Sequence, residues 1–215
     1  MTDTSQAGGD RPAPAAEGPH LRKAAEADVR ELALSLADAF YEDPVFGWLM
    51  PDENSRPARL RRFFAIELRH VALERGRAWT VDELGGAAIT TPPGAWRMPP
   101  LAALTQGATF GLRLARAGRL LAAVERRHPR DPHYYFAAIG VRRGMQGKGL
   151  GSALMGPTLQ RCDREGLPAY LEASSERSAA LYERLGFSVI RELHVGDSPP
   201  LWLMLRSPRA GGATP

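Results

Sequence analysis

The stretch QGKGLG, residues 146–151, constrains the fold most, because it places three glycines in six positions between a predicted strand and a predicted helix. The strand covers 133–141 and the helix 149–166. At the start of such a helix, successive backbone N–H groups point in one direction and carry the positive end of the helix dipole. Glycines there let a ligand approach the main chain without meeting a Cβ, so the loop is typical of a diphosphate-binding site.

Three other interpretations of this loop have to be weighed. A kinase-type P-loop requires Ser or Thr after its GK pair, but Gly149 follows Gly147 and Lys148. A dinucleotide fingerprint GxGxxG needs glycine where the chain has Ser152, although Glu172 stands where a ribose-binding acid would lie. A tight turn without a ligand is the third, but turn geometry alone does not explain three glycines beside three cations. These cations are Arg142, Arg143 and Lys148, and we expect them to supply compensating charge around the diphosphate.

The remaining pattern predicts one α/β domain over residues 20–206. Strands are predicted at 20–24, 77–81, 86–91, 133–141, 169–174, 187–195 and 201–205, and helices at 28–40, 57–75, 99–127, 149–166 and 175–186. Asp28 is the predicted N-cap of the first helix, and 41–51, with two prolines, is predicted to be an irregular loop. We expect residues 1–19 to be a disordered leader and 207–215 a disordered tail.

Composition narrows the location and the partners. The most apolar region, 101–124, carries three arginines, and the N-terminus has no apolar signal-peptide region, so we expect a cytoplasmic protein without a membrane partner. The formal charge of +4 favours a solvated basic surface over a nucleic-acid footprint.

Cys162 is the only cysteine, which excludes an internal disulfide and a thiolate zinc cluster. It lies in a helical pattern, so we interpret it as a buried small hydrophobic residue rather than a nucleophile. We expect no metal site.

Two segments of the chain resemble the GNAT superfamily of N-acetyltransferases. In IGVRRGMQGKGLGSALM, the family's acetyl-CoA-binding signature is matched at Gln146, Gly149 and Gly151. In LYERLGF, the family's tyrosine, four residues before Gly-Phe, is Tyr182. The resemblance is plain over 133–206 and implies an α/β (α+β) fold: a single domain with a mixed, mostly antiparallel sheet, flanked by helices and opened by a V-shaped acetyl-CoA cleft.

The resemblance implies acetyl-CoA as cosubstrate and suggests the residues that hold it. The strand before the loop is expected to splay from its neighbour, so that Ile139 and Val141, with Gly140 between them, offer main-chain groups to the pantetheine arm and the oxyanion. Ser178 stands where many relatives carry asparagine, and its hydroxyl reaches less far toward the cofactor. The loop residues expected at the cofactor are Gln146, Gly147, Lys148, Gly149, Leu150, Gly151 and Ser152.

Acetyl transfer to an amine needs an acid for the leaving thiolate and a base for the amine. The family match makes Tyr182 the acid, whereas periodicity alone favours a half-buried packing role. Glu172, acting through water, is the best candidate for the base, and a strand-end ion pair is its alternative. His133 is a weaker candidate, because a single histidine at a strand start is usually structural. Cys162 is disfavoured, since it lies about three turns down the helix from the loop.

The acceptor site is expected in the N-terminal half. An aromatic and acidic pocket for a cationic amine could form there, although packing between the first two helices is the favoured alternative. The candidates are Phe40, Tyr41, Glu42, Asp43, Phe46 and Trp48.

Within the family, YLEASSERSAALYERLGF most resembles members that acetylate an antibiotic. The leading function is therefore direct acetyl transfer, in a ternary complex, to a primary amine of a small molecule such as an antibiotic or xenobiotic. A protein N-terminal or lysine acetyltransferase and a noncatalytic acetyl-CoA-binding module are the alternatives. We expect a monomer or a homodimer that binds no nucleic acid.

Overall fold

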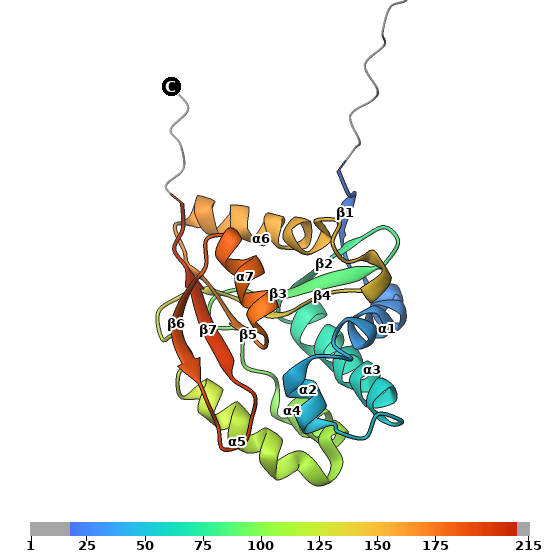
Figure 1. Ribbon diagram of the computed structural model, residues 1–215. Helices are drawn as coiled ribbons and strands as arrows, with labels where there is room; N and C mark the ends of the chain where they lie inside the picture. Colours follow the sequence, from blue (N-terminus) through green and yellow to red (C-terminus); the bar gives the residue numbers. More distant parts are fainter. Residues whose placement is uncertain (1–17, 210–215) are drawn as a thin grey trace, which may run out of the picture.

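A computed structural model describes residues 18–209 and contains one seven-stranded sheet (Figure 1). The strands are β1 (Leu21–Lys23), β2 (Arg77–Val81), β3 (Gly86–Thr91), β4 (Tyr134–Val141), β5 (Ala169–Ala173), β6 (Ser188–Leu193) and β7 (Leu201–Arg206). They lie in the order β1-β2-β3-β4-β5-β7-β6, and every neighbouring pair is antiparallel except β4 with β5. The predicted α/β domain with a mixed, mostly antiparallel sheet is confirmed.

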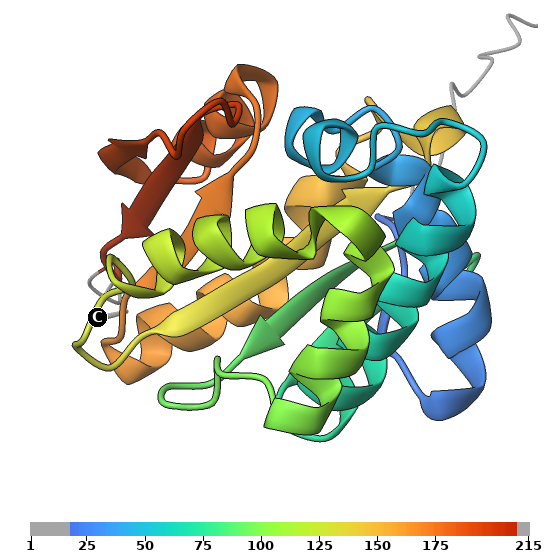
Figure 2. The same ribbon diagram turned by 90° about the horizontal axis from the view of Figure 1, so that it is seen from below.

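Helices cover both faces of this sheet. They are α1 (Val29–Ala39), α2 (Pro44–Leu49), α3 (Arg56–Glu67), α4 (Pro100–Gly107), α5 (Leu114–Glu125), α6 (Leu150–Glu165) and α7 (Glu176–Arg184), with short 3₁₀ or π segments η1 (Glu26–Asp28), η2 (Leu68–Leu73), η3 (Ala108–Arg113) and η4 (Arg143–Met145). Figure 2 shows α5 lying over one face of the sheet, with α6 on the other. The largest core packs α1, α2, α3 and α5 against the sheet, and a second packs α6 and α7 against β4, β5 and β7.

The only parallel pair in the described sheet comes apart soon after it begins. In β4, Tyr134 and Tyr135 are in register with Ala169 and Tyr170 of β5, and no described residue of β5 pairs with 136–141. On its other edge β5 pairs with β7 along its whole length, from Ala169 to Ala173. The predicted splay of the strand before the glycine loop is therefore confirmed, and it leaves one edge of β4 without a neighbouring strand.

A β-bulge in β4 changes which side chains face the cleft. Thr90 of β3 pairs with Phe136 and Ile89 pairs with Ala138, so Ala137 is an extra residue in β4. Phe136 packs in the α6–α7 core, whereas Ala138 packs in the core under α1 and α3. The bulge thus reverses the alternation of the strand before it reaches the loop.

The prediction of an irregular loop over 41–51 is wrong, because α2 forms there. Asp43 Oδ1 accepts the backbone N–H groups of Val45 at 2.9 Å and Phe46 at 3.0 Å. Pro44 occupies the first turn, where its missing N–H is not needed. The Asp-Pro pair is a helix start signal that the number of prolines obscured.

Asp28 precedes α1 as predicted but does not cap it, because its side chain makes no hydrogen bond to the first turn of that helix. Instead it accepts the N–H of Ala25 at 2.8 Å and pairs with Arg22 of β1 at 2.7 Å. The carboxylate therefore ties the first strand to η1.

The expected leader and tail lie outside the described residues, except for 18–19 and 207–209. Within residues 18–209 no helix has the length and apolar character needed to cross a membrane.

Candidate active site

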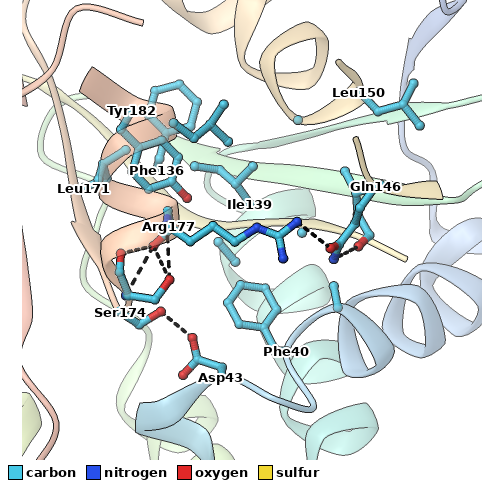
Figure 3. A pocket seen from close by; sticks show the side chains of 18 of the residues that line it. Phe40, Asp43, Phe136, Ile139, Gln146, Leu150, Leu171, Ser174, Arg177 and Tyr182 are labelled. Atoms are coloured by element: carbon cyan, nitrogen blue, oxygen red, sulfur yellow. Dashed lines mark hydrogen bonds between the residues drawn. The ribbon is translucent and has the colours of Figure 1, made fainter. Parts of the chain in front are cut away.

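A cleft of about 660 Å³ opens where β4 and β5 diverge (Figure 3). Its walls come from the turn between α1 and α2, from β4 and the glycine loop, and from β5, α6 and α7. Lys148 is exposed and is not among the lining residues. The other residues predicted for the cosubstrate, and the favoured acid and base, all line the cleft: Ile139, Gly140, Val141, Gln146, Gly147, Gly149, Leu150, Gly151, Ser152, Glu172, Ser178 and Tyr182.

The three glycines of the loop differ in what requires them. Gly147 and Gly149 have φ values of +79° and +76°, a left-handed conformation that side chains rarely adopt, and both face open space. Gly151 has no such conformation, and a Cβ built on it would meet only Leu181, at 3.6 Å. Turn geometry therefore explains two glycines, while the third leaves the first turn of α6 bare.

The start of α6 offers free main-chain donors. Gly149 is its N-cap residue and has no side chain with which to satisfy the N–H groups of the first turn. The helix is 16 residues long, so the positive end of its dipole adds to these donors. This arrangement fits a diphosphate group.

Two arginines that the sequence suggested for the diphosphate make contacts with α1 and with the turn after it. Arg143 pairs with Asp38 at 2.9 Å and with Glu42 at 3.2 Å. Arg142 donates to the hydroxyl of Ser35 at 2.9 Å. Both guanidinium groups are thus bonded to α1 or the turn after it, while Arg143 also lines the cleft. Their compensating charge at a diphosphate stays a prediction.

Gln146 joins three parts of the cleft. Its amide donates to the carbonyl of Val141 at 2.9 Å and accepts a hydrogen bond from Arg177 of α7 at 3.4 Å (Figure 3). Arg177 is a cation at the cleft that sequence reasoning missed. Because the Val141 carbonyl is already bonded, the groups left for a ligand on this edge of β4 are centred on Ile139.

Gly140 lies where packing leaves no room for a side chain. A Cβ at this position would lie 2.9 Å from both Leu36 and Phe40. The missing side chain allows α1 to approach β4, and this brings Phe40 to the wall of the cleft.

Ser178 lines the cleft but is also part of the start of α7. Its backbone N–H donates to the hydroxyl of Ser175 at 3.2 Å, and its own hydroxyl donates to the Ser175 carbonyl at 2.8 Å. The same hydroxyl oxygen accepts the backbone N–H of Ser175 at 3.3 Å, so the side chain of Ser178 both donates and accepts inside the first turn of α7. Its contact with a cofactor stays a prediction.

Tyr182 combines the two roles weighed from the sequence. Its ring is 7% exposed, packs near Phe187 in the core of α7, and lines the cleft (Figure 3). Burial, and secondarily the charge of Asp43, raise the pKa of its phenol above the ordinary value. The phenol therefore keeps its proton and can act as a donor.

Glu172 is a buried carboxyl group without a cationic partner of the Arg or Lys type in the described chain. Its side chain is 11% exposed, Oε2 accepts the hydroxyl of Tyr135 at 2.9 Å, and Oε1 lies 3.9 Å from His128 Nδ1. Burial raises its pKa to about 7, against the opposing effect of the Tyr135 hydrogen bond. The alternative of a strand-end ion pair is therefore not supported, and the group can take a proton near neutral pH.

Asp43 crosses the cleft to the end of β5. Its Oδ2 accepts the hydroxyl proton of Ser174, while Oδ1 starts α2 (Figure 3). Burial raises the pKa of this carboxyl above its usual range. The sequence placed Asp43 only near an aromatic loop, since its contact with Ser174 joins residues 131 positions apart.

Most of the aromatic candidates pack in the core. Phe46 lies edge-on to Phe40 and Phe63, with ring centroids 5.6 and 5.1 Å away, so the packing alternative is confirmed for it. Trp48 stacks under Arg116 at 4.7 Å. Phe40 is the aromatic residue of this group that also lines the cleft.

Two weaker candidates are placed away from the cleft. Cys162 is fully buried in α6, and burial raises the pKa of its thiol to about 12, so it is unsuited to nucleophilic attack. His133 is 5% exposed and does not line the cleft. Among residues 18–209, no group of three or more His, Cys, Asp or Glu side chains is arranged to hold a metal ion.

Residues 77–187, which include β2 to β5 and most of the cleft, match the Acetyltransferase (GNAT) family. An uncharacterized N-acetyltransferase of Schizosaccharomyces pombe is 29% identical over 202 residues, which are 84% of this chain and 80% of the relative. A crystal structure from Corynebacterium glutamicum, described as histone acetyltransferase HPA2 and related acetyltransferase, has a TM-score of 0.69 at 27% identity and covers 92% of this chain and 100% of its own. A polyamine N-acetyltransferase of Drosophila melanogaster shares the fold, with a TM-score of 0.56 at 18% identity over 88% of this chain and 100% of its own.

Proposed function

The chain belongs to the GNAT acetyltransferase family and is an acyltransferase with acetyl-CoA as cosubstrate, and on that premise we propose that it acetylates a primary amine of a small molecule. The observation that carries the proposal is that an acid and a base candidate, Tyr182 and Glu172, line the same cleft as the glycine loop. Acetyl transfer needs those two groups on either side of the reacting carbon.

We assign the loop and the free edge of β4 to the cosubstrate. The diphosphate is held by main-chain N–H groups of Gly149, Leu150, Gly151 and Ser152 at the start of α6, with Gln146 and Gly147 shaping the turn and Lys148 adding charge from the exposed side. The main chain around Ile139 is left for the pantetheine arm and for the oxyanion, because no strand pairs with this part of β4 on that side in the described chain, whereas the Val141 carbonyl is bonded to Gln146. Ser178 is the proposed contact from α7, and its hydroxyl would exchange a bond with Ser175 for one with the cosubstrate.

Tyr182 is the proposed acid for the thiolate. Its phenol is protonated, sits on the wall between α7 and the cleft, and can give its proton to sulfur as the thioester breaks. Most of the rate comes from holding thioester and amine together, which can contribute about 7–11 kcal/mol, so few catalytic side chains are needed.

Glu172 is the proposed base for the amine. With a pKa of about 7 it is half ionised near neutral pH and can take the amine proton, directly or through one water. Its neighbour Tyr135 fixes one carboxylate oxygen, and the other oxygen is buried without a hydrogen-bond partner in the described chain, so the carboxyl group must rotate to present it to the amine.

A small acceptor suits the shape of the cleft. The hydrogen bond between Ser174 and Asp43 spans the cleft on one side and that between Arg177 and Gln146 spans it on another, which favours a compact molecule over an extended peptide. Glu172 and Asp43 give this space an acidic lining suited to a cationic amine. The stretch YLEASSERSAALYERLGF, residues 170–187, resembles puromycin N-acetyltransferase, so an antibiotic or xenobiotic amine is the leading acceptor.

The test is an acetylation screen read by release of free thiol. Small primary amines, including aminonucleosides and polyamines, are compared with peptides bearing a free N-terminus or an internal lysine. Turnover with small amines supports the proposal. Turnover confined to peptides points to protein acetylation, and acetyl-CoA binding without any turnover points to a noncatalytic binding module.

A further inference from the structure

Three consecutive helical segments, α4, η3 and α5, present leucine side chains to the outside of the molecule. Of the eight large hydrophobic side chains that are exposed in the described residues, five lie between residues 101 and 121. These five define what we call the α4–α5 surface: Leu101, Leu104, Leu112, Leu114 and Leu121. A single exposed leucine needs no explanation, but a group of five in one part of the chain is typical of a contact site.

The helices that carry these leucines pack together as one unit. Figure 2 shows α4 and α5 joined to each other and both on the side that faces the viewer. Leu114 lies against the end of α4, because a Cβ built on Gly107 would be 3.0 Å from its Cδ1. Gly111, with a φ of +55°, breaks the helical path just before Leu112, whose side chain is fully exposed. Leu121 follows Leu114 by two turns and so shares one side of α5 with it.

The same segments carry an excess of positive charge. Residues 100–127 contain five arginines and one acidic residue, so their net charge equals the +4 of the whole chain. Arg119 and Arg126 are exposed and lie two turns apart, along another side of α5 from the leucines. Among the ion pairs of residues 18–209, only one of the five arginines takes part, since Arg116 pairs with Asp197 at 3.2 Å. The α4–α5 surface therefore combines apolar side chains with unpaired cations.

Leucines beside unpaired arginines fit an anionic lipid bilayer better than they fit a macromolecular partner. A second copy of the chain would cover the leucines but would bring two sets of arginines face to face, and like charges across an interface oppose association. A nucleic acid would pair with the arginines but leave the leucines uncovered. The only aromatic residue of the segment, Phe110, is buried and cannot stack on a base. A bilayer accommodates both kinds of side chain, because its acyl chains lie directly below its phosphate groups.

We propose that the α4–α5 surface docks on an anionic lipid bilayer, with its leucines at the upper acyl chains and with Arg119 and Arg126 at the lipid phosphates. The helices lie on the bilayer and do not cross it, because arginines interrupt residues 101–124. The expectation of no membrane partner rested on those arginines, which exclude a span but suit the polar boundary of the bilayer. Docking does not depend on which amine is acetylated, since none of these side chains lines the cleft.

The first test uses the full chain and lipid vesicles in a flotation assay. Vesicles of phosphatidylglycerol and phosphatidylcholine in equal amounts should bind the protein at least about 10-fold more tightly than vesicles of phosphatidylcholine alone. Binding should weaken as salt is added, because salt screens the attraction between arginines and phosphates. No binding to the anionic vesicles, or equal binding to both kinds, would overturn the docking.

Substitutions separate the contribution of the leucines from that of the arginines. Leu112→Ser should lower binding to the anionic vesicles about 10-fold, because it removes an apolar side chain from the contact. Arg119→Gln should lower it about 5-fold through the loss of one charge. Leu34→Ser and Arg30→Gln are the matched controls and should leave binding unchanged, since both side chains are exposed on α1, on a different side of the molecule (Figure 1).

Thermal unfolding and titration with acetyl-CoA keep these results separate from the fold and from the proposed function. None of the four substituted residues lines the cleft, so every variant should keep the unfolding temperature and the acetyl-CoA affinity of the unmodified chain. Vesicle binding that survives Leu112→Ser, or that falls equally in the controls, would contradict the docking. A dimer that dissociates in Leu112→Ser would assign the surface to a second copy of the chain. Binding of duplex DNA without binding of vesicles would assign it to nucleic acid.

Discussion

The two sides of the cleft present different chemical groups, main chain on one side and side chains on the other. The side formed by residues 146–152 uses main-chain groups, with two glycines in left-handed conformations and a bare helix start. The other side, which we assign to the acceptor, uses partly buried side chains, chiefly Phe40, Asp43 and Glu172, which reach the cleft from the end of α1, the start of α2 and β5. The first side is specified by a short local segment, whereas the second exists only after distant segments have packed together.

The largest expected effect tests whether the chemistry depends on the acid between these two sides. Tyr182→Phe keeps the ring in the core of α7 and removes the hydroxyl, so turnover should fall about 10²- to 10⁴-fold with acetyl-CoA affinity nearly unchanged. Steady-state kinetics and calorimetric titration measure the two quantities. Tyr134→Phe is the matched control, because that hydroxyl bonds to Glu165 and does not line the cleft. Equal turnover in both variants would remove the acid role of Tyr182.

The next largest effect concerns the acceptor side alone. Glu172→Gln should lower kcat about 10²-fold without changing the KM for acetyl-CoA, because the amide cannot take a proton. In the unmodified enzyme kcat should rise with pH through about 7: the pKa of Glu172 is raised from 4.5, so the base is protonated and idle below that range and ionised above it. In the variant this rise should be missing.

The matched control for that change is Glu165→Gln, an exposed acid at the end of α6 that pairs with Arg161. It should keep the activity and the pH profile of the unmodified enzyme. A pH profile that survives in Glu172→Gln would place the base elsewhere on the acceptor side.

The same contrast explains how much the sequence could predict. The order of strands and helices follows from periodicity. The splay of β4 and the lining of the cleft by Gly149 and Tyr182 were implied by the resemblance to the GNAT family that two local motifs carry. The sequence did not reveal the contact of Asp43 with Ser174 or the reach of Arg177, because both depend on packing between segments far apart in the chain. It also missed α2, where an N-cap signal was outweighed by the count of prolines.

A smaller effect should show which glycines on the cosubstrate side are needed for the approach of acetyl-CoA and which are needed for the shape of the turn. Gly151→Val adds a side chain over the first turn of α6 and meets only Leu181, so acetyl-CoA should bind at least about 10-fold more weakly while the fold is kept. Gly149→Val should weaken binding as well, but its φ of +76° makes a loss of stability part of the result. Titration with acetyl-CoA and thermal unfolding distinguish the two cases.

Gly156→Val is the control for this comparison, since it lies in the same helix, has nothing within 4 Å of an added Cβ and does not line the cleft. Unchanged acetyl-CoA binding in Gly151→Val would show that the bare first turn does not contact the cosubstrate. The main-chain contacts with acetyl-CoA on this side would then be limited to Gly147 and Gly149.

The smallest effect tests whether the acceptor side works through charge or only through shape. Asp43→Asn can keep its hydrogen bonds with Val45, Phe46 and Ser174, because the amide oxygen accepts and the amide nitrogen donates. At a pH above the raised pKa of Asp43, the KM for a cationic amine should rise about 2- to 5-fold, with kcat and thermal stability little changed. Asp43→Ala should differ by also losing about 1 kcal/mol of stability with the N-cap of α2. An unchanged KM in Asp43→Asn, with the expected loss in Asp43→Ala, would mean that Asp43 only holds α2 in place, and that Glu172 is the acid that attracts the amine.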